Sequence, residues 1–147
     1  MTLQIAQPGD FERINALFVE MLRSIYPAQP VEGYAAGALD RYFSGGADRI
    51  FTVPAEGEII AFLSVEVHRE DGGFLYLDDF SVTEKYRCRG IGTALLHHAA
   101  AYAQELQLPA LRLHVESSNL AALRLYQRLG FELEEKQGER LLLRREP

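Results

Sequence analysis

The chain has 147 residues, a length typical of one domain, and 48% of its residues are hydrophobic. With 24% charged residues this is ordinary globular composition, which excludes a disordered or fibrous chain. The net charge of -6 argues against a nucleic-acid or anionic-membrane surface and mildly favours a cationic partner. The single cysteine, Cys88, excludes an internal disulfide framework and argues against a cysteine-based metal site.

The chain opens without a basic-then-apolar leader, and its uncharged stretches are interrupted by glycine and polar residues. Secretion and membrane spanning are therefore not supported, and the cytoplasm is the expected location. Repeats, low-complexity runs and linkers are also absent from the sequence. We therefore expect one domain over residues 1–147.

The first third of the chain is predicted to form a short strand and two helices. Residues 3–6 are typical of a strand, and Asp10 can cap a helix over about 11–25, where apolar residues recur every three or four positions. A second helix is expected over about 31–43, with an apolar stripe of Tyr34, Ala38 and Tyr42. Two glycines weaken this helix by about 1 kcal/mol each, so we expect it to be mobile.

From residue 49 onward the pattern changes to strands alternating with helices. The expected elements are strands over 50–53, 58–67 and 74–82, a helix over about 90–106, a strand over 111–115, a helix over about 119–129, and strands over 131–134 and 140–143. Ser117 or Ser118 is expected to cap the last helix. This order predicts an α/β fold in which about four helices flank a mixed sheet.

A basic loop containing glycines joins the 74–82 strand to the next helix. Gly90 and Gly92 carry no Cβ and allow a ligand to approach the backbone closely. The unpaired N–H groups at the start of a helix favour a phosphate. Lys85, Arg87 and Arg89 add positive charge to this loop. The loop is therefore a candidate phosphate site, and the plain alternative is a tight turn into a helix.

Two other phosphate-binding motifs fit this loop poorly. A Walker loop requires a lysine after its last glycine, and Thr93 follows Gly92 here. A dinucleotide-binding motif requires a small residue where this chain has Leu95. Glu116 does lie about where a ribose-binding acid would, so the dinucleotide alternative stays open.

Two consecutive aspartates, Asp78 and Asp79, lie within an otherwise apolar strand. Successive side chains of a strand face opposite sides of the sheet. Burying an unpaired carboxylate lowers the stability of the fold by several kcal/mol. Either the strand bulges here or one carboxylate lines a water-filled cleft. The alternative is an edge strand in which both aspartates are solvated.

A third feature is the run from Asn119 to Phe131, in which Tyr126 lies two helical turns after Asn119. Taken alone, Tyr126 is more simply a core tyrosine. Together, the three features resemble the GNAT superfamily of acetyl-coenzyme A-dependent N-acetyltransferases. Residues 87–92 are similar to its Gln/Arg-x-x-Gly-x-Gly/Ala signature, and residues 119–131 to its second motif. The strand over 76–82 is similar to that of the diamine acetyltransferase branch, with Asp78 in place of Glu.

The resemblance implies a GNAT-like sheet with splayed central strands and a coenzyme A site between them. It implies these coenzyme-binding residues: Phe80, Val82, Arg87, Cys88, Arg89, Gly90, Ile91, Gly92, Thr93, Asn119 and Tyr126. The loop would hold the pyrophosphate, the backbone around Val82 would pair with pantetheine, and Asn119 would contact the pantetheine arm. Tyr126 would protonate the departing thiolate, and Asp78 or Asp79 would accept the amine proton, directly or through water. No metal is required.

The implied reaction is acetyl transfer from acetyl-coenzyme A to a primary amine of a small cationic molecule, by direct attack. The aromatic residues expected to border the acceptor are Tyr26, Tyr34 and Tyr42. A protein N-terminus or lysine is the alternative acceptor, and a homodimer is an open alternative for assembly. Glu66 is a reserve candidate for the base. Nucleophilic catalysis by Cys88 is not needed, because an amine can attack the thioester directly. One of the two mid-helix histidines, His97 and His98, is expected to be packed and the other exposed. Two rival functions stay open: a non-catalytic acyl-coenzyme A-binding module, and a nucleotide-dependent oxidoreductase or methyltransferase.

Overall fold

The computed structural model describes residues 1–147 as seven strands, four α-helices and two short 3-10 helices. The strands are β1 Gln4–Ile5, β2 Arg49–Ala55, β3 Glu58–His68, β4 Phe74–Val82, β5 Leu111–Glu116, β6 Glu132–Gln137 and β7 Arg140–Arg145. The helices are α1 Phe11–Ile25, α2 Asp40–Phe43, α3 Ile91–Glu105 and α4 Leu120–Arg128, with 3-10 turns at Pro8–Asp10 and Glu84–Tyr86. The strand order is β1-β2-β3-β4-β5-β7-β6, so the predicted mixed α/β class is confirmed. None of the helices combines the length and apolar character needed to cross a membrane.

The chain divides into two compact units, which we describe separately. The first comprises Met1–Val65 and Asp79–Leu95, and the second comprises Glu66–Asp78 and Leu96–Pro147. Strands β3 and β4 and helix α3 contribute residues to both units. The expectation of one domain over the whole chain stays a prediction.

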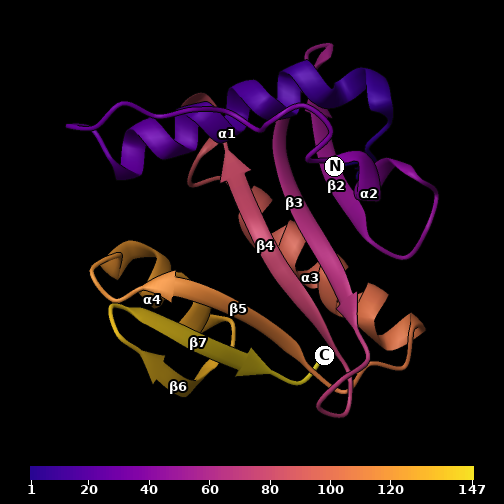
Figure 1. The fold of residues 1–147 in the computed structure, drawn as a ribbon, viewed down its shortest axis with the longest axis vertical. Coiled ribbons are helices and arrows are strands. Elements are labelled where there is room, and N and C mark those ends of the chain that lie inside the picture. The colour runs from indigo at the N-terminus through magenta and orange to yellow at the C-terminus, as the bar shows by residue number, and fades with distance from the viewer. The chain divides into compact units, whose positions relative to one another are not determined.

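In the first unit, α1 packs across β2 and β3 (Figure 1). Ile14 and Leu17 of α1 are fully buried against Ile50 of β2 and Phe62 of β3. The antiparallel β2–β3 hairpin turns at Glu56 and Gly57, which both have positive φ, the conformation that a two-residue hairpin turn requires. This packing holds one end of the sheet beneath α1.

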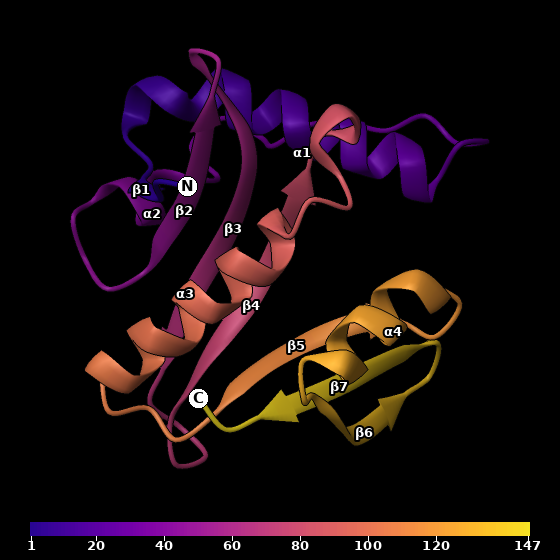
Figure 2. The same cartoon turned by 180° about the vertical axis from the view of Figure 1, so that it is seen from behind.

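In the second unit, β4 pairs in parallel with β5 over Leu75–Leu77, and β5 and β6 each pair with β7 in antiparallel fashion. Buried leucines alternate along β5 with the partly exposed Arg112 and His114. Because strand side chains alternate between faces, these two polar residues share the face opposite the apolar one. Helix α4 lies over β5 and β7 on the face that Figure 2 presents.

The predicted helix over 31–43 is wrong apart from its last turn, because only Asp40–Phe43 are helical. The side chain of Asn15 in α1 accepts a hydrogen bond from the Tyr34 backbone N–H at 2.7 Å, which ties this segment to α1 in an irregular conformation. Gly33 packs so closely on Asn15 that a Cβ would overlap it, and Gly37 has φ +81°. The two glycines therefore serve a close approach and a turn rather than weakening a helix.

Smaller differences concern the ends of elements. The predicted ranges of α1 and β4 are confirmed to the residue, whereas β2 extends through Pro54 across a bulge. Asn119, not Ser117 or Ser118, caps α4, since its side chain accepts from Ala122 N–H at 3.2 Å. Both His97 and His98 are exposed, so the expectation that one is packed is wrong.

Candidate active site

The basic loop between β4 and α3 lies in the first unit, and its backbone is shaped for close approach. Cys88 and Gly90 have φ of +61° and +80°, and Cys88 is an exposed free thiol. The first hydrogen bond of α3 runs from Ala94 N to Gly90 O at 3.0 Å. The preceding N–H groups of Ile91, Gly92 and Thr93 therefore have no carbonyl partner within the helix. Backbone donors at a helix start, beside basic side chains, can bind a phosphate group.

Glu20 of α1 anchors the start of this loop. Its carboxylate accepts hydrogen bonds from Thr83 Oγ1 at 2.8 Å and from Glu84 N at 3.1 Å. It also pairs with Arg87 at 3.3 Å, and the Arg87 Nε donates to Val82 O at 2.9 Å. The Arg87 guanidinium therefore binds a carboxylate and a backbone carbonyl of the protein itself, and these contacts hold the loop in its conformation.

Glu56, at the tip of the β2–β3 hairpin, anchors the middle of the loop. Its carboxylate accepts from Tyr86 Oη at 2.6 Å and pairs with Lys85 at 3.2 Å. The hydrogen bond from Tyr86 and the nearby Lys85 lower the pKa of Glu56. The Arg89 guanidinium lies over the Tyr86 ring at 5.3 Å. Arg89 is exposed, and its guanidinium contacts an aromatic ring, whereas Lys85 and Arg87 form ion pairs with acids.

Replacing Glu20 by alanine is expected to lower the free energy of unfolding by about 1–2 kcal/mol, because three donors lose their acceptor at a half-exposed site. Glu12→Ala on the exposed face of α1 is the matched control and should change stability by less than about 0.5 kcal/mol. Urea denaturation followed by circular dichroism measures both. Equal stability of the two variants would show that Glu20 does not anchor the loop.

Gly92 has a packing role that the sequence did not reveal, and its expected role in coenzyme binding stays a prediction. A Cβ at Gly92 would lie 2.8 Å from Cζ of Phe80, so the glycine allows the Phe80 ring to pack on the start of α3. A Cβ at Gly90 would meet nothing within 4 Å. Gly90 is therefore the glycine with open space beside it, whereas Gly92 is needed for packing between β4 and α3.

The two strand aspartates have different surroundings. Asp78 is exposed, whereas Asp79 is half-buried and accepts a hydrogen bond from Tyr34 Oη at 2.6 Å. The Asp79 backbone N–H donates to Ser64 Oγ of β3 at 2.9 Å. Because β4 lies between β3 and β5 in the sheet, the alternative of an edge strand is wrong. The two carboxylates therefore differ in exposure, and the alternation of side chains in a strand places them on opposite faces of the sheet.

Of the three tyrosines expected near the acceptor, only Tyr34 contacts a candidate site residue. Its ring stacks on Phe18 of α1 with centroids 4.0 Å apart, and this contact aims the hydroxyl at Asp79. Tyr42 is buried in the core of the first unit, so it cannot bind an acceptor there. Tyr26 ends α1 and is 38% exposed.

Tyr126 and Asn119 belong to the second unit, on and beside α4. The Tyr126 ring contacts Phe131 edge to face, with centroids 5.7 Å apart, and burial raises its pKa to about 12. Tyr126 is therefore a protonated donor throughout the neutral range. The side-chain oxygen of Asn119 caps α4, which leaves its amide nitrogen to donate elsewhere.

Sequence reasoning missed several residues that shape this site. Asn15, Phe18, Glu20, Glu56 and Ser64 each contact a predicted site residue or its loop from elsewhere in the first unit. None of them carries a local motif. An acidic residue on the exposed side of α1 resembles any solvated residue until its partner, more than sixty positions away, is known.

Comparison with a solved structure establishes the fold, and a family model establishes the class of protein. PaiA N-acetyltransferase from Thermoplasma acidophilum, solved in complex with coenzyme A, superposes with a TM-score of 0.80, and the alignment covers 100% of each chain. The sequence identity is 16%, so this likeness establishes the fold. The chain belongs to the acetyltransferase (GNAT) family, whose family model matches residues 15–131.

Two curated relatives are similar to parts of the chain. Mycothiol acetyltransferase of Paenarthrobacter aurescens (strain TC1) is 36% identical over 87 residues, which are 56% of this chain and 26% of that protein. Spermine/spermidine N(1)-acetyltransferase of Bacillus subtilis (strain 168) is 30% identical over 83 residues, 52% of this chain and 55% of that protein. The match thus spans about a quarter of the first relative's length and about half of the second's.

Proposed function

We propose that the protein transfers an acetyl group from acetyl-coenzyme A to a primary amine of a small cationic acceptor, by direct attack in a ternary complex. One observation carries the proposal: a chain that matches the GNAT family over 15–131 presents, between β4 and α3, a loop with unpaired N–H groups and an exposed arginine.

The residues of the loop fit the phosphates of coenzyme A. The N–H groups of Ile91, Gly92 and Thr93, with Arg89, would hold the pyrophosphate, and the open space beside Gly90 admits it. The backbone of Phe80 and Val82 would run beside the pantetheine arm, and Asn119 and Tyr126 would contact it from α4. The thioester supplies an activated acetyl group, and no residue of the chain needs to become acylated.

The chain must remove a proton from the acceptor and supply one to the leaving group. A lysine-like ammonium has a pKa near 10.4, so forming the neutral amine at pH 7 costs roughly 4–5 kcal/mol. Asp78, which is exposed, or the half-buried Asp79, which accepts a hydrogen bond from Tyr34, would accept this proton directly or through water. Tyr126, kept protonated by its raised pKa, would donate to the departing thiolate.

The charge of the protein supports a cationic acceptor. The net charge is -6, and both strand aspartates lie on β4. Carboxylates raise the local concentration of an ammonium ion and repel an anionic acceptor. One relative is named for spermine and spermidine, which are polyamines. A protein N-terminus is the alternative acceptor, because its pKa of about 8 requires less help from a base.

Asp78→Asn is expected to raise the Michaelis constant several-fold more for 1,4-diaminobutane than for butylamine, because the lost attraction grows with the charge of the acceptor. Steady-state rates with each amine at saturating acetyl-coenzyme A measure the effect. Glu12→Gln is the matched control, since it removes one exposed carboxylate from α1. An equal change for both amines would assign Asp78 to proton transfer alone, and no change would make Glu66 the first alternative.

The proposed activity is tested by thiol release from acetyl-coenzyme A with a panel of polyamines, amino acids, aminoglycosides and N-terminal peptides. We expect release that depends on an amine and a product heavier by one acetyl group. Tight binding of coenzyme A without release on any amine would instead indicate a non-catalytic acyl-coenzyme A-binding module. Binding of NAD or S-adenosylmethionine in preference to coenzyme A would overturn the proposal.

A further inference from the structure

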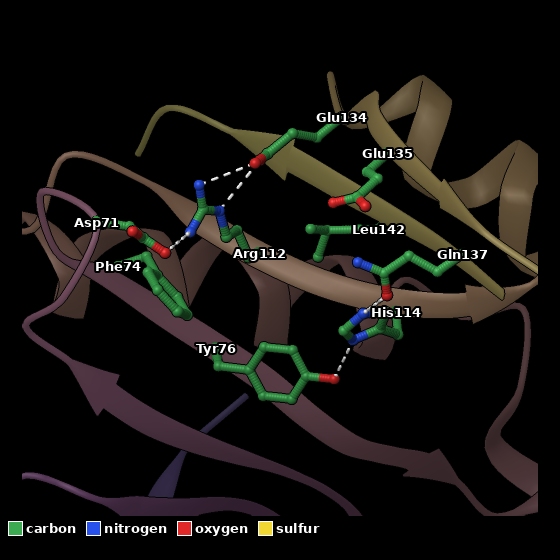
Figure 3. A pocket seen from close by; sticks show the side chains of 9 residues that line it. All are labelled: Asp71, Phe74, Tyr76, Arg112, His114, Glu134, Glu135, Gln137 and Leu142. Atoms are coloured by element: carbon green, nitrogen blue, oxygen red, sulfur yellow. Dashed lines mark hydrogen bonds and ion pairs between the residues drawn. The ribbon is translucent and has the colours of Figure 1, made fainter.

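A pocket of about 300 Å³ lies in the second unit, on the sheet face that carries Arg112 and His114 (Figure 3). Its walls come from β4, β5, β6 and β7 and from the turn before β4. Aromatic and aliphatic side chains line it together with charged ones. A cavity of this size and mixed lining is typical of a site for a small molecule.

The charged groups of this pocket leave one carboxylate without a partner among them. Arg112 donates two hydrogen bonds to Glu134, at 3.0 and 2.8 Å, and its guanidinium lies 3.8 Å from the carboxylate of Asp71. Glu135 points into the pocket and is joined to none of the other residues drawn (Figure 3). Because three carboxylates accompany one guanidinium, the pocket favours a positively charged occupant, and Glu135 is the acid available to bind it.

A β-bulge in β6 brings Glu135 to this face of the sheet. The pairing of β6 with β7 shifts by one residue between Leu133 and Glu135, which leaves Glu134 as the extra residue. Successive side chains of a regular strand face opposite sides, whereas Glu134 and Glu135 both line the pocket. Bulges re-aim side chains in this way beside active sites. The bulge therefore gives β6 two acids on one face, of which Glu134 binds Arg112 and Glu135 faces the cavity.

Apolar surface lies between Glu135 and the exposed aspartate of β4. Leu142 of β7 is directly opposite Glu135 on β6, and it also lines the pocket. On β4, Asp78 follows Tyr76 by two residues, so both side chains are on the pocket face. Strands β4 and β6 are three strand spacings apart, about 14 Å in total. A ligand that contacts both carboxylates must therefore carry two well-separated positive charges on a chain that can pack on Leu142 and Tyr76.

We propose that this pocket binds the outer ammonium group of a linear di- or polyamine acceptor, and that Glu135 determines this specificity by pairing with that group. The inference rests on the proposed function, and it names the class of acceptor and the residue that selects it. The amine to be acetylated lies beside Asp78, and the methylene chain lies over Tyr76 and Leu142. The ion pair with Glu135 is the same before and during acetyl transfer, so it strengthens binding without changing the chemical step.

The alternative is that Glu135 is an ordinary solvated residue of an edge strand, where charged side chains prevent pairing with other chains. Removing its charge would then affect every acceptor alike. The amines 1,8-diaminooctane and octylamine distinguish the two roles, because they share the reacting amine and the chain and differ in the outer ammonium group.

The experiment measures steady-state rates of wild type and Glu135→Gln with each of these amines, at low salt and saturating acetyl-coenzyme A. We expect the Michaelis constant for the diamine to rise about fivefold in Glu135→Gln, the effect of one exposed ion pair, while kcat stays nearly unchanged. The constant for octylamine should stay the same. Glu132→Gln is the matched control, because it removes an exposed carboxylate of the same strand that does not line the pocket.

Reversing the charge gives a second readout. Glu135→Lys should lower the Michaelis constant for 8-aminooctanoic acid about threefold or more relative to wild type, because the outer carboxylate then meets an ammonium group.

The length of the acceptor gives a third readout. Wild type should prefer 1,8-diaminooctane to 1,4-diaminobutane by a larger factor than it prefers octylamine to butylamine, because the longer diamine can extend from Asp78 to Glu135. In Glu135→Gln the two preferences should become similar.

Circular dichroism shows first that each variant is folded. Equal changes for 1,8-diaminooctane and octylamine in Glu135→Gln, or no change for either, would overturn the assignment of Glu135. Equal length preferences for diamines and monoamines in wild type would overturn the placement of the acceptor across the sheet. A wild-type protein that acetylates no amine would instead overturn the proposed function, so the two failures are distinguishable.

Discussion

Tyr126→Phe is expected to lower turnover about a hundredfold and to leave coenzyme A binding nearly unchanged. The substitution keeps the ring and its edge-to-face contact with Phe131, and removes only the hydroxyl. Loss of a general acid has effects of this size. Because burial raises the pKa of Tyr126 to about 12, the hydroxyl is protonated at every pH from about 6 to 9. The fold-loss in turnover should therefore be constant across that range.

Steady-state rates at saturating concentrations of both substrates and calorimetric titration with coenzyme A separate the two quantities. Thermal denaturation of Tyr126→Phe controls for stability and should match that of wild type closely. If turnover is unchanged, Tyr126 has only a packing role or departure of the thiolate is not rate-limiting. A loss of coenzyme A affinity with normal turnover would assign Tyr126 to binding.

The elements with strong local patterns could be predicted from the sequence. Helix α1 has apolar residues at three- and four-residue spacing after a turn, and β4 is an apolar strand between a glycine turn and a basic loop, so both ranges were predictable. The helix over 31–43 could not be excluded locally. The Asn15–Tyr34 hydrogen bond that holds this segment in an irregular conformation joins residues 19 positions apart. A tertiary contact of this kind overrides a weak helical stripe.

The candidate site likewise contains parts that a local motif reveals and parts that depend on contacts between distant residues. The loop over 87–93 and the run from Asn119 to Phe131 are contiguous motifs, so a single sequence reveals them. The anchoring acids are not contiguous with their partners, since Glu20 and Arg87 are 67 positions apart. Tyr76 Oη and His114 Nδ1, which lie 2.6 Å apart, are likewise brought together only by the parallel pairing of β4 and β5. Residues that meet across strands carry no signal until the register is known.

Gly92 shows a further limit of motif reasoning. The motif marks the position as glycine, which the sequence alone attributes to close approach of a phosphate. In the structure its missing Cβ makes room for the Phe80 ring. Any larger residue at position 92 would therefore collide with the Phe80 ring in the protein itself, before any ligand binds.

Gly92→Val is expected to weaken acetyl-coenzyme A binding at least tenfold while the protein remains folded. A Cβ would lie 2.8 Å from Phe80 Cζ, so the half-buried ring must turn away from the start of α3. This movement would disturb the end of β4 and the loop whose N–H groups we propose to bind the phosphates, at a cost typical of overpacking, about 1–3 kcal/mol. Calorimetric titration with coenzyme A measures the affinity, and circular dichroism confirms the fold.

Gly90→Ala is the matched control, because its Cβ meets nothing within 4 Å. Its positive φ should lower stability by about 1 kcal/mol without blocking the site. A double-mutant cycle with Phe80→Ala identifies the cause. If the ring collision is responsible, Gly92→Val should weaken binding much less in the Phe80→Ala background than in wild type. An equal loss in both backgrounds would show that the valine blocks the phosphates directly, and unchanged affinity in a folded Gly92→Val protein would remove this loop from the coenzyme site.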